Sequence, residues 1–365
     1  MTQTTKDPIL LLGSYGRGNI GDDAFLLAAL RLFKGHELFI NSTNDSLLPE
    51  AVKGQVSTIA TSGAKDLLQK LRVFRRIRHI VYCGGDLWVE LYGDRFPRQS
   101  LYKMVIVNLI ARLTGKKVHY LGCGIGALQG YSLFLARLSA RLAQGIVVRE
   151  VRSARVLGLS KIRVLPDLVT TLPVTTTPER TTKFTIGVSL LYHLPNPQET
   201  FPKLIATLAE VLRKLPRSHY RIVLFPMLAS PEDEHDDVWA SAELERLLPD
   251  ADISIASGRE FSDYTDDLRQ VDILIGARLH ASIIALLAGV PALGIAYRPK
   301  VAQFFGGNGL EHYCIALDDL TPGKLEATLH DMRTRHQSVR NDFIAAKQRI
   351  ASQQGGYKDF VATYF

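Results

Sequence analysis

Residues 10–30 read "LLLGSYGRGNIGDDAFLLAAL": an apolar run, a glycine-rich turn and then a helical pattern. The turn Gly16–Gly21 satisfies G-x-G-x-x-G, the spacing that dinucleotide-binding folds place between a strand and a helix. Asp22 and Asp23 follow the last glycine, however, and carboxylates at a helix start cap the N–H groups and repel a pyrophosphate. The stretch therefore predicts a strand–turn–helix unit of an α/β fold and does not favour a dinucleotide site.

The polar side chains of this turn point to a different ligand. Asn19 and Asp22 follow the first predicted strand, and ligands of open α/β sheets bind at the carboxyl ends of strands. An amide and a carboxylate suit a substrate that carries hydroxyl groups. The structural alternative, a glycine turn whose aspartate only caps the helix, stays open at this point.

The composition is that of a globular protein with a hydrophobic core. Of the 365 residues, 46% are hydrophobic and 22% are charged. Apolar stretches such as "MVIVNLIARL" from Met104 are too short to span a bilayer, and the first residues lack the pattern of a signal peptide. Cys83, Cys123 and Cys314 show no metal-site spacing and are odd in number. We therefore expect a cytoplasmic protein.

The charge balance predicts anionic partners. Lys and Arg number 44 against 36 Asp and Glu, which gives a net charge of +8. Part of this excess lies in residues 65–80, "KDLLQKLRVFRRIRHI", where apolar residues recur at helical spacing and basic residues lie off that stripe. A solvated basic face on a packed helix is the favoured interpretation, and peripheral contact with an anionic membrane is the alternative. No basic motif interleaved with aromatic residues supports nucleic-acid binding.

Strand and helix patterns alternate through two halves of the chain. They predict an α/β fold of two Rossmann-like domains, residues 1–174 and 183–330, facing each other across a cleft. The Thr- and Pro-rich stretch Leu172–Lys183 is the candidate linker. Residues 331–365 form a predicted helical tail that could pack back on the N-terminal domain.

The strongest candidate for a functional site lies in residues 271–300, "VDILIGARLHASIIALLAGVPALGIAYRPK". A buried strand ends at Gly276, and Arg278 and His280 occupy the turn into the next helix, where the helix dipole favours anions. An arginine binds carboxylate or phosphate through two hydrogen bonds, and a histidine beside it can move a proton. Lys300 follows the next strand and could converge on the same pocket. For His280 alone, a satisfied core histidine is the alternative.

These stretches resemble the polysaccharide pyruvyl transferase family. The segments that carry the resemblance are "GSYGRGNIGDDA" (13–24), "YCGGDL" (82–87), "GCGIGAL" (122–128), "VVREVRSARVLGL" (147–159) and "RLHASIIALLAGVPALGIAYRPK" (278–300). The resemblance runs from about Ile9 to Phe305. Within these segments Ser14, Asp23, Cys83, Ala127 and Glu150 are substitutions relative to the family pattern. Outside them two family residues are missing: Leu191 replaces the arginine of S-L-R-P, and Leu228 replaces the histidine of P-M-H.

The resemblance implies a fold like that of GT-B glycosyltransferases and a ketal-forming transferase of polysaccharide biosynthesis. Such an enzyme transfers pyruvate from phosphoenolpyruvate, its co-substrate, onto two hydroxyls of one sugar and releases phosphate. The acceptor would be a sugar of an exopolysaccharide or cell-envelope polysaccharide, or a lipid-linked oligosaccharide precursor. The N-terminal domain would hold this acceptor and the C-terminal domain the donor. No further cofactor is implied.

The implied catalytic residues are His280, Arg278 and Asp22. His280 would act as acid and base, Arg278 would hold an anionic group of the donor, and Asp22 would contact the acceptor. The implied substrate-binding residues are Gly18, Asn19, Gly21, Asp86, Arg149 and Lys300. Among these, Lys300 and Arg149 are the expected partners of the donor phosphate. No metal is implied, and "PEDEHDD", residues 231–237, is interpreted as a solvated loop.

Two other functions fit the sequence. A glycosyltransferase of the same architecture would use a nucleotide sugar, because fold alone does not determine function. A degenerate homologue could instead serve as a non-catalytic subunit of a polysaccharide assembly complex, an option that only the losses at Leu191 and Leu228 support. The sequence specifies neither the modified sugar and its hydroxyl pair nor the ketal stereochemistry or the oligomeric state.

Overall fold

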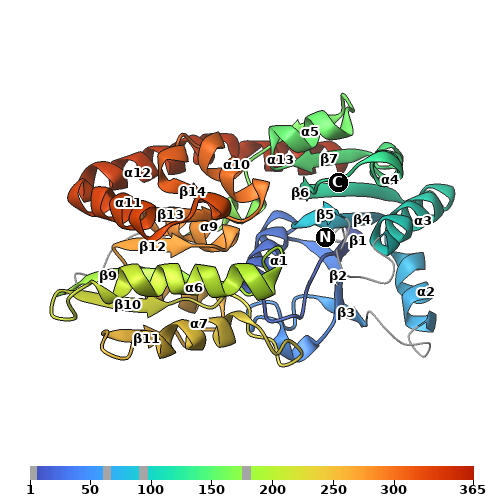
Figure 1. Cartoon of the computed structure of the whole chain (residues 1–365). Coiled ribbons are helices and arrows are strands. Elements are labelled where there is room, and N and C mark those ends of the chain that lie inside the picture. The colour runs from blue at the N-terminus through green and yellow to red at the C-terminus, as the bar shows by residue number, and fades with distance from the viewer. Residues whose placement is uncertain (1–5, 61–66, 90–97, 175–181) are drawn as a thin grey trace. The chain divides into compact units, whose positions relative to one another are not determined.

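The chain folds into two α/β units (Figure 1). The computed structural model describes residues 6–60, 67–89, 98–174 and 182–365. The first unit comprises Met1–Arg17, Asp22–Leu172 and Gln353–Phe365, and the second comprises Gly18–Gly21 and Pro173–Ser352. Most of the predicted linker, residues 175–181, lies outside the described residues, as does the start of the predicted basic helix, residues 65–66.

A parallel sheet forms the centre of the first unit. Its strand order is β3-β2-β1-β4-β6-β7-β8, with β5 paired to β6. The strands are β1 (Lys6–Leu12), β2 (His36–Ser42), β3 (Ser57–Ala60), β4 (His79–Cys83), β5 (Asp86–Trp88), β6 (Lys117–Ile125), β7 (Gly145–Val148) and β8 (Ile162–Val164). β4 and β7 are buried along their whole length, which explains why they read as continuous apolar runs in the sequence.

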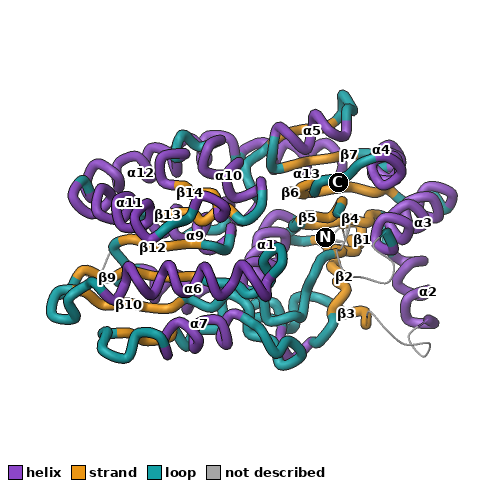
Figure 2. Tube along the Cα trace, in the orientation of Figure 1, coloured by secondary structure: helices purple, strands orange, loops and turns teal. Residues whose placement is uncertain are grey.

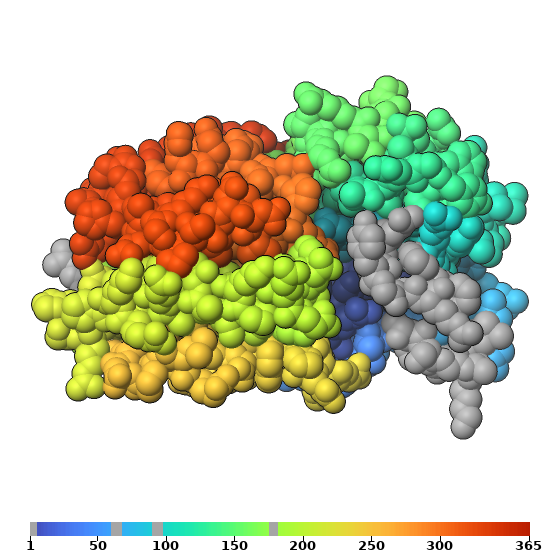
Figure 3. All heavy atoms as spheres, in the orientation of Figure 1, coloured from blue at the N-terminus to red at the C-terminus, as the bar shows by residue number. Residues whose placement is uncertain are grey.

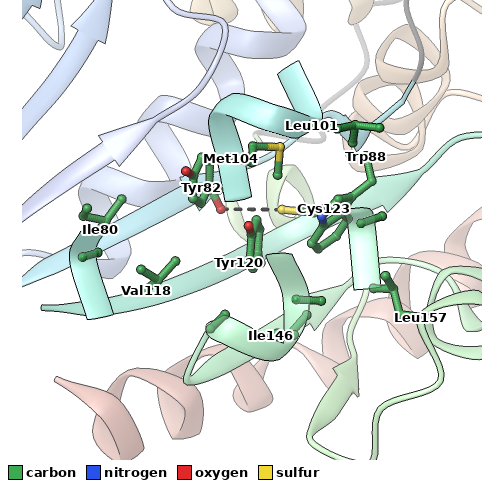
Figure 4. Packing of buried hydrophobic residues seen from close by; sticks show 14 of the residues in the cluster. Ile80, Tyr82, Trp88, Leu101, Met104, Val118, Tyr120, Cys123, Ile146 and Leu157 are labelled. Carbon is green, nitrogen blue, oxygen red and sulfur yellow. Dashed lines mark hydrogen bonds between the residues drawn. The ribbon is translucent and has the colours of Figure 1, made fainter. Parts of the chain in front are cut away.

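Helices cover both faces of this sheet (Figure 2). They are α1 (Ile20–Leu32), α2 (Leu67–Arg76), α3 (Gln99–Leu113), α4 (Gly130–Leu142), α5 (Val151–Leu157) and, near the end of the chain, α13 (Gly355–Tyr364). Helices α2 to α5 contribute to one continuous core with the sheet, part of which Figure 4 shows. Its labelled residues are Ile80, Tyr82, Trp88, Leu101, Met104, Val118, Tyr120, Cys123, Ile146 and Leu157.

The end of the chain packs on the first unit. The ring of Phe365 stacks on His79 at 4.3 Å and lies 4.9 Å from the ring of Phe33, the residue after α1. The Tyr357 hydroxyl donates a hydrogen bond to the Pro166 carbonyl at 2.6 Å. Residues 353–365 therefore belong to the unit that the start of the chain builds.

The second unit repeats the same plan. Its parallel sheet has the order β11-β10-β9-β12-β13-β14. The strands are β9 (Phe184–Ser189), β10 (Tyr220–Leu224), β11 (Ile253–Ile255), β12 (Ile273–Gly276), β13 (Ala292–Ala296) and β14 (Cys314–Ala316). The helices are α6 (Pro197–Arg213), α7 (Asp237–Arg246), α8 (Phe261–Leu268), α9 (Leu279–Ala288), α10 (Pro299–Gly307), α11 (Pro322–Thr334) and α12 (His336–Gln353).

The predicted α/β class is confirmed for both units. In each sheet the strand order reverses beside its first strand, as in doubly wound folds. Within the described residues, no helix is long and apolar enough to cross a membrane.

Candidate active site

The Arg278–His280 turn lies at the carboxyl end of a central strand of the second unit. Strand β12 ends at Gly276, and α9 begins at Leu279 with Arg278 as the residue that precedes its first turn. The remaining residues of α9 are almost all buried and apolar, and Gly289 ends the helix in the left-handed conformation. The buried helix therefore fixes the positions of Arg278 and His280 at its amino terminus.

Arg278 forms a two-point ion pair with a buried aspartate. Its Nε and Nη2 donate to the two carboxylate oxygens of Asp237 at 2.8 and 2.5 Å. The Asp237 side chain is fully buried, and it also accepts hydrogen bonds from the backbone N–H groups of Met227 and Leu228 at 3.1 and 3.0 Å. Burial raises the pKa of Asp237, and Arg278 and the two backbone donors oppose that shift. The guanidinium is thus held in one orientation.

Residues Gly18–Gly21 belong to the second unit, although the chain on either side of them belongs to the first. They run antiparallel to the loop after β10, with the Ile20 N–H bonded to the Met227 carbonyl and the Ala229 N–H bonded to the Gly18 carbonyl, both at 2.9 Å. Asn19 pairs with Leu228 in an isolated β-bridge. Residues Gly18–Gly21 therefore form part of the surroundings of the Arg278–His280 turn.

Gly21 packs directly against His280. A β-carbon at position 21 would overlap Nδ1 of the imidazole and would lie 2.8 Å from its Cγ. The backbone of Gly21 is not in the left-handed region. The close approach to His280 therefore accounts for a glycine at this position.

Asn19 caps the first helix. Its side-chain oxygen accepts a hydrogen bond from the Gly21 N–H at 2.9 Å, and α1 begins at Ile20. Asp22 and Asp23 lie in the first turn of α1, where carboxylates complement the helix dipole, and both belong to the first unit. The structure thus brings Asn19, Gly18 and Gly21 together with the Arg278–His280 turn and places Asp22 in the other unit.

Basic residues also lie at the start of the next helix. Strand β13 pairs with β12, with Gly294 opposite Gly276, and α10 begins directly after it at Pro299. Lys300 lies in the first turn of α10, and Arg298 is an exposed residue just before it. The amino termini of α9 and α10 therefore follow neighbouring strands, and cationic side chains accompany both.

Arg149 lies in a separate cluster in the first unit. Its Nη2, Nε and Nη1 atoms donate to the carboxylates of Asp86, Glu150 and Asp167 at 2.6, 3.0 and 3.1 Å. Burial alone would lower the pKa of Arg149, but these three carboxylates outweigh it and raise the pKa. A β-carbon on Gly124 would lie 2.6 Å from an Asp86 oxygen, so glycine is needed beside the cluster.

This cluster unites Asp86 and Arg149, which the sequence singled out from two distant segments. Every nitrogen of the guanidinium contacts a carboxylate, so the predicted contact with a donor phosphate would require the phosphate to replace one of them. The Arg149 side chain is only 4% exposed. The geometry is that of a buried ion cluster whose residues follow the carboxyl ends of β4, β7 and β8, with Asp86 at the start of β5.

Sequence reasoning missed Asp237. The stretch 231–237 was expected to be a solvated loop, and this is wrong for Asp237, which is fully buried against Arg278. Asp236 caps α7 by accepting from the Trp239 N–H at 2.9 Å. The pair of aspartates before a helical pattern signals such a cap, but nothing local indicates that Asp237 binds an arginine 41 residues away.

The two departures from the family pattern lie around the same loop. Leu228, at the position of the missing histidine, donates its N–H to Asp237, and Leu191 is buried after β9. Tyr192 stacks on His235 at 4.5 Å in an aromatic cluster beside them. Within the residues that the structure describes, no group of three or more His, Cys, Asp or Glu could hold a metal ion.

Comparisons with known proteins agree with this fold. The family model described as "Polysaccharide pyruvyl transferase" matches residues 19–299. A search of curated protein sequences gave no match. Anabaena Alr3699/HepE in complex with UDP-glucose is 11% identical with a TM-score of 0.65 over 98% of this chain and 100% of that one. The UDP-GlcNAc 2-epimerase of Neisseria meningitidis bound to UDP-GlcNAc is 11% identical with a TM-score of 0.61, over 98% of this chain and 99% of its own. Acinetobacter baumannii MurG, 14% identical, has a TM-score of 0.54 over 98% and 99% of the two chains. These likenesses establish a GT-B-like fold.

Proposed function

We propose, from the premise that the chain belongs to the polysaccharide pyruvyl transferase family, that it transfers pyruvate from phosphoenolpyruvate to two hydroxyls of one sugar. The observation that carries the proposal is the Arg278–His280 turn, with Arg278 fixed by the buried Asp237 and His280 packed on Gly21. An oriented cation beside a proton-transferring group is what an anionic donor with a phosphate leaving group requires.

The donor site is assigned to the second unit. Phosphoenolpyruvate carries a carboxylate and a phosphate, and the amino termini of α9 and α10 both favour anions. Arg278 would share its guanidinium between Asp237 and one anionic group, and Lys300 would contact the other. Arg149 is kept as a proposed second phosphate partner through exchange with one of its carboxylates.

The proposed reaction needs one acid, one base and charge stabilisation. Protonation of the methylene carbon by His280 turns it into a methyl group and leaves an oxocarbenium-like centre, which the first sugar hydroxyl attacks with loss of its proton to the base. The second hydroxyl then displaces phosphate, and its proton balances the released anion. Arg278 and Lys300 would stabilise the leaving phosphate. In this proposal phosphoenolpyruvate is a co-substrate, and the reaction uses no cofactor or metal.

The acceptor is assigned to residues at the start of α1. Asn19 and Asp22 would hydrogen-bond sugar hydroxyls, with Gly18 and Gly21 allowing the close approach of the main chain. The acceptor class is a polysaccharide sugar or its lipid-linked precursor. A lipid-linked acceptor would bring the protein to an anionic membrane surface as a peripheral partner.

A phosphate-release assay with phosphoenolpyruvate and a panel of glycosides tests this proposal. Release that depends on both the donor and one glycoside, with a ketal in the product by mass spectrometry, is the expected result. Calorimetry with phosphoenolpyruvate alone measures donor binding separately. If phosphoenolpyruvate neither binds nor reacts, pyruvyl transfer is refuted.

The second candidate is a nucleotide-sugar glycosyltransferase. Leu191 and Leu228 stand where the family pattern has an arginine and a histidine, and the similar solved structures include complexes with UDP-glucose and UDP-GlcNAc. This candidate predicts binding of UDP- or GDP-sugars and no phosphate release from phosphoenolpyruvate. A non-catalytic subunit would show neither activity.

A further inference from the structure

Large apolar side chains are exposed on one group of helices in the first unit. Of the twelve that are exposed among the described residues, nine lie on α2, α3 and α4. Six of them form what we call the α3–α4 face: Tyr102, Ile106, Leu109 and Leu113 of α3, and Tyr131 and Phe134 of α4. Figure 3 shows side chains of this part of the chain, teal to green, at the outer surface of the first unit.

The exposed residues of α3 follow the period of a helix. Tyr102, Ile106, Leu109 and Leu113 recur at intervals of four, three and four residues, so they form one continuous stripe. The opposite side of the helix, with Leu101 and Met104, is buried in the core. A helix with one face on the core normally has polar residues on the other. Here that side carries apolar residues instead, with Ile106 55% and Leu113 78% exposed. An exposed apolar stripe of this kind is typical of an interaction surface.

The sequence segment that contains this stripe carries charged residues of one sign. Residues 95–149 contain no Asp or Glu, whereas the whole chain has 36 in 365 residues. Among the residues of this segment that the structure describes, the exposed basic ones are Arg98, Lys103, Arg112, Lys117 and Arg141. The apolar face is therefore bordered by positive charge that no acid within the segment offsets.

Aromatic rings connect the two helices of the face. Tyr102 and Tyr131 lie 6.2 Å apart between ring centroids, and Tyr131 stacks on Phe134 at 5.9 Å. The Arg98 guanidinium lies 6.0 Å from the Tyr131 ring. Tyrosine and arginine side chains in this combination favour the boundary between lipid headgroups and acyl chains, because each has an apolar body and a polar end.

We propose that the α3–α4 face docks on the surface of an anionic bilayer. Apolar and aromatic side chains would enter the interface while the basic border meets lipid phosphates. A second copy of this chain fits less well, because a two-fold contact would place the same acid-free basic border against itself. The inference goes beyond the proposed function and does not depend on the reaction. It also extends the predicted membrane contact from the basic helix to α3 and α4.

Flotation with vesicles tests the docking. The purified full chain is mixed with phosphatidylcholine vesicles that either contain or lack phosphatidylglycerol, at low and high salt. We expect flotation with the anionic vesicles, at least ten-fold weaker binding to neutral ones, and weakening by salt. The double variant Ile106→Glu with Leu113→Glu is expected to lose at least ten-fold in binding, as is Lys103→Glu with Arg112→Glu.

Matched controls separate the face from general effects of charge. Ile344→Glu changes an exposed isoleucine of α12, and Arg217→Glu changes an exposed arginine of the second unit; both should bind like the parent. Ile106→Ser with Leu113→Ser removes apolar area without adding charge and should also weaken binding. Because all these positions are exposed, circular dichroism should show parental melting temperatures.

Three results would overturn the inference: a parent that does not float with anionic vesicles, face variants that float as well as the parent, or a parental dimer that the face variants convert to a monomer in light scattering. A phosphate-release assay with a short glycoside in free solution, without vesicles, distinguishes a failure of membrane docking from a failure of the proposed reaction. The variants of the α3–α4 face should keep the parental rate of phosphate release in this assay, whether or not they float with vesicles.

Discussion

Gly21 and the imidazole of His280 are in contact so close that no side chain fits between them: a β-carbon on residue 21 would overlap Nδ1. The last glycine of the G-x-G-x-x-G pattern is thus explained by a histidine from a turn more than 250 residues later in the chain. A dinucleotide turn uses this glycine to let a helix pack closely on a strand. Here it allows the imidazole of His280 to lie against the start of a helix.

Gly21→Ala should therefore impair turnover more than folding. The added methyl group must displace the His280 ring, and overpacking of this kind costs about 1–3 kcal/mol. We expect kcat for phosphate release to fall by about 10- to 100-fold, because small displacements of a catalytic group are costly. Phosphoenolpyruvate affinity by calorimetry should change little.

Gly323→Ala is the matched control, since a β-carbon there meets nothing within 4 Å and the backbone is not left-handed. It should keep the parental kcat. A Gly21→Ala protein with parental kcat would show that the contact does not position the imidazole for chemistry.

Asp237→Asn should weaken both the fold and the donor site. The substitution removes the charge that balances Arg278, and breaking a buried pair from one side costs about 3–5 kcal/mol. The KM for phosphoenolpyruvate should rise because the guanidinium is no longer held in one orientation. Denaturant unfolding and steady-state phosphate release measure the two effects.

Asp236→Asn, one residue earlier, is the control. Asparagine is as good a helix cap as aspartate, so this variant should behave like the parent. If Asp237→Asn lowers stability but leaves the KM unchanged, Asp237 supports only the fold and does not orient Arg278 for the donor.

The α/β class could be predicted because its determinants are local. Buried parallel strands such as β4 and β7 read as short apolar runs, and the turn from Gly276 to His280 places polar residues at a strand end. The helix start before Asp22 was also visible. The sequence predicts Asp22 and Asp23 as caps of this helix, whereas in the structure the Gly21 N–H donates to the side chain of Asn19. Asparagine and aspartate are equally good caps, so the sequence alone does not distinguish them.

The partners of the charged residues could not be predicted from sequence. Arg278 binds Asp237 at a separation of 41 residues, and Arg149 binds Asp86 at a separation of 63. Such pairs depend on how loops from different strands meet at the sheet edge, and no periodicity encodes that. The pairing of Asn19 with Leu228 is equally invisible, because an isolated bridge leaves no pattern of alternating residues.

The buried pair His79 and His119 should make the first unit sensitive to acid. Burial lowers the pKa of His79 to about 4 and that of His119 to about 3, from an ordinary value of 6.5. The unfolded chain therefore binds protons that the folded chain does not, so stability is complete above about pH 6.5 and falls as the pH decreases toward 4. Melting temperatures between pH 7 and pH 4 measure this slope.

His119→Phe should flatten the slope, because an apolar ring replaces a titrating one among the aromatic residues of α13. His330→Asn, on the outer side of α11, should leave the slope as in the parent. An unchanged slope in His119→Phe would mean that other groups control the acid sensitivity.

Arg149→Met tests whether the ion cluster is structural. Asp86, Glu150 and Asp167 would lose their shared cation, which we expect to cost about 3–5 kcal/mol. Without the cation, burial favours protonated carboxyls, so this variant should gain stability as the pH falls from 7 to 5, opposite to the histidine pair. Arg155→Met, an exposed change on α5, is the control. Parental stability in Arg149→Met would favour a role in donor binding alone.

The last prediction separates the proposed role of Arg278 in donor binding from that of His280 in proton transfer. His280→Gln keeps a similar size and some hydrogen bonding but removes the ability to move a proton, so kcat should fall by about 10²–10⁴-fold with donor affinity nearly unchanged. Arg278→Lys keeps the charge but loses the two-point geometry to Asp237, so donor affinity should fall clearly while the proton transfer itself persists.

His235→Gln is the matched control for the first change, because it removes a histidine from the aromatic cluster beside Tyr192 and not from the Arg278 turn. The two site variants should change different kinetic parameters: His280→Gln should lower kcat, and Arg278→Lys should raise the KM for phosphoenolpyruvate. If the protein is a non-catalytic subunit, the parent will show no turnover that His280→Gln could lower. If it is a nucleotide-sugar enzyme, the parent will not bind the phosphoenolpyruvate that Arg278→Lys is expected to weaken. A folded His280→Gln protein with normal turnover would remove the histidine from the mechanism, and the pyruvyl-transfer proposal with it.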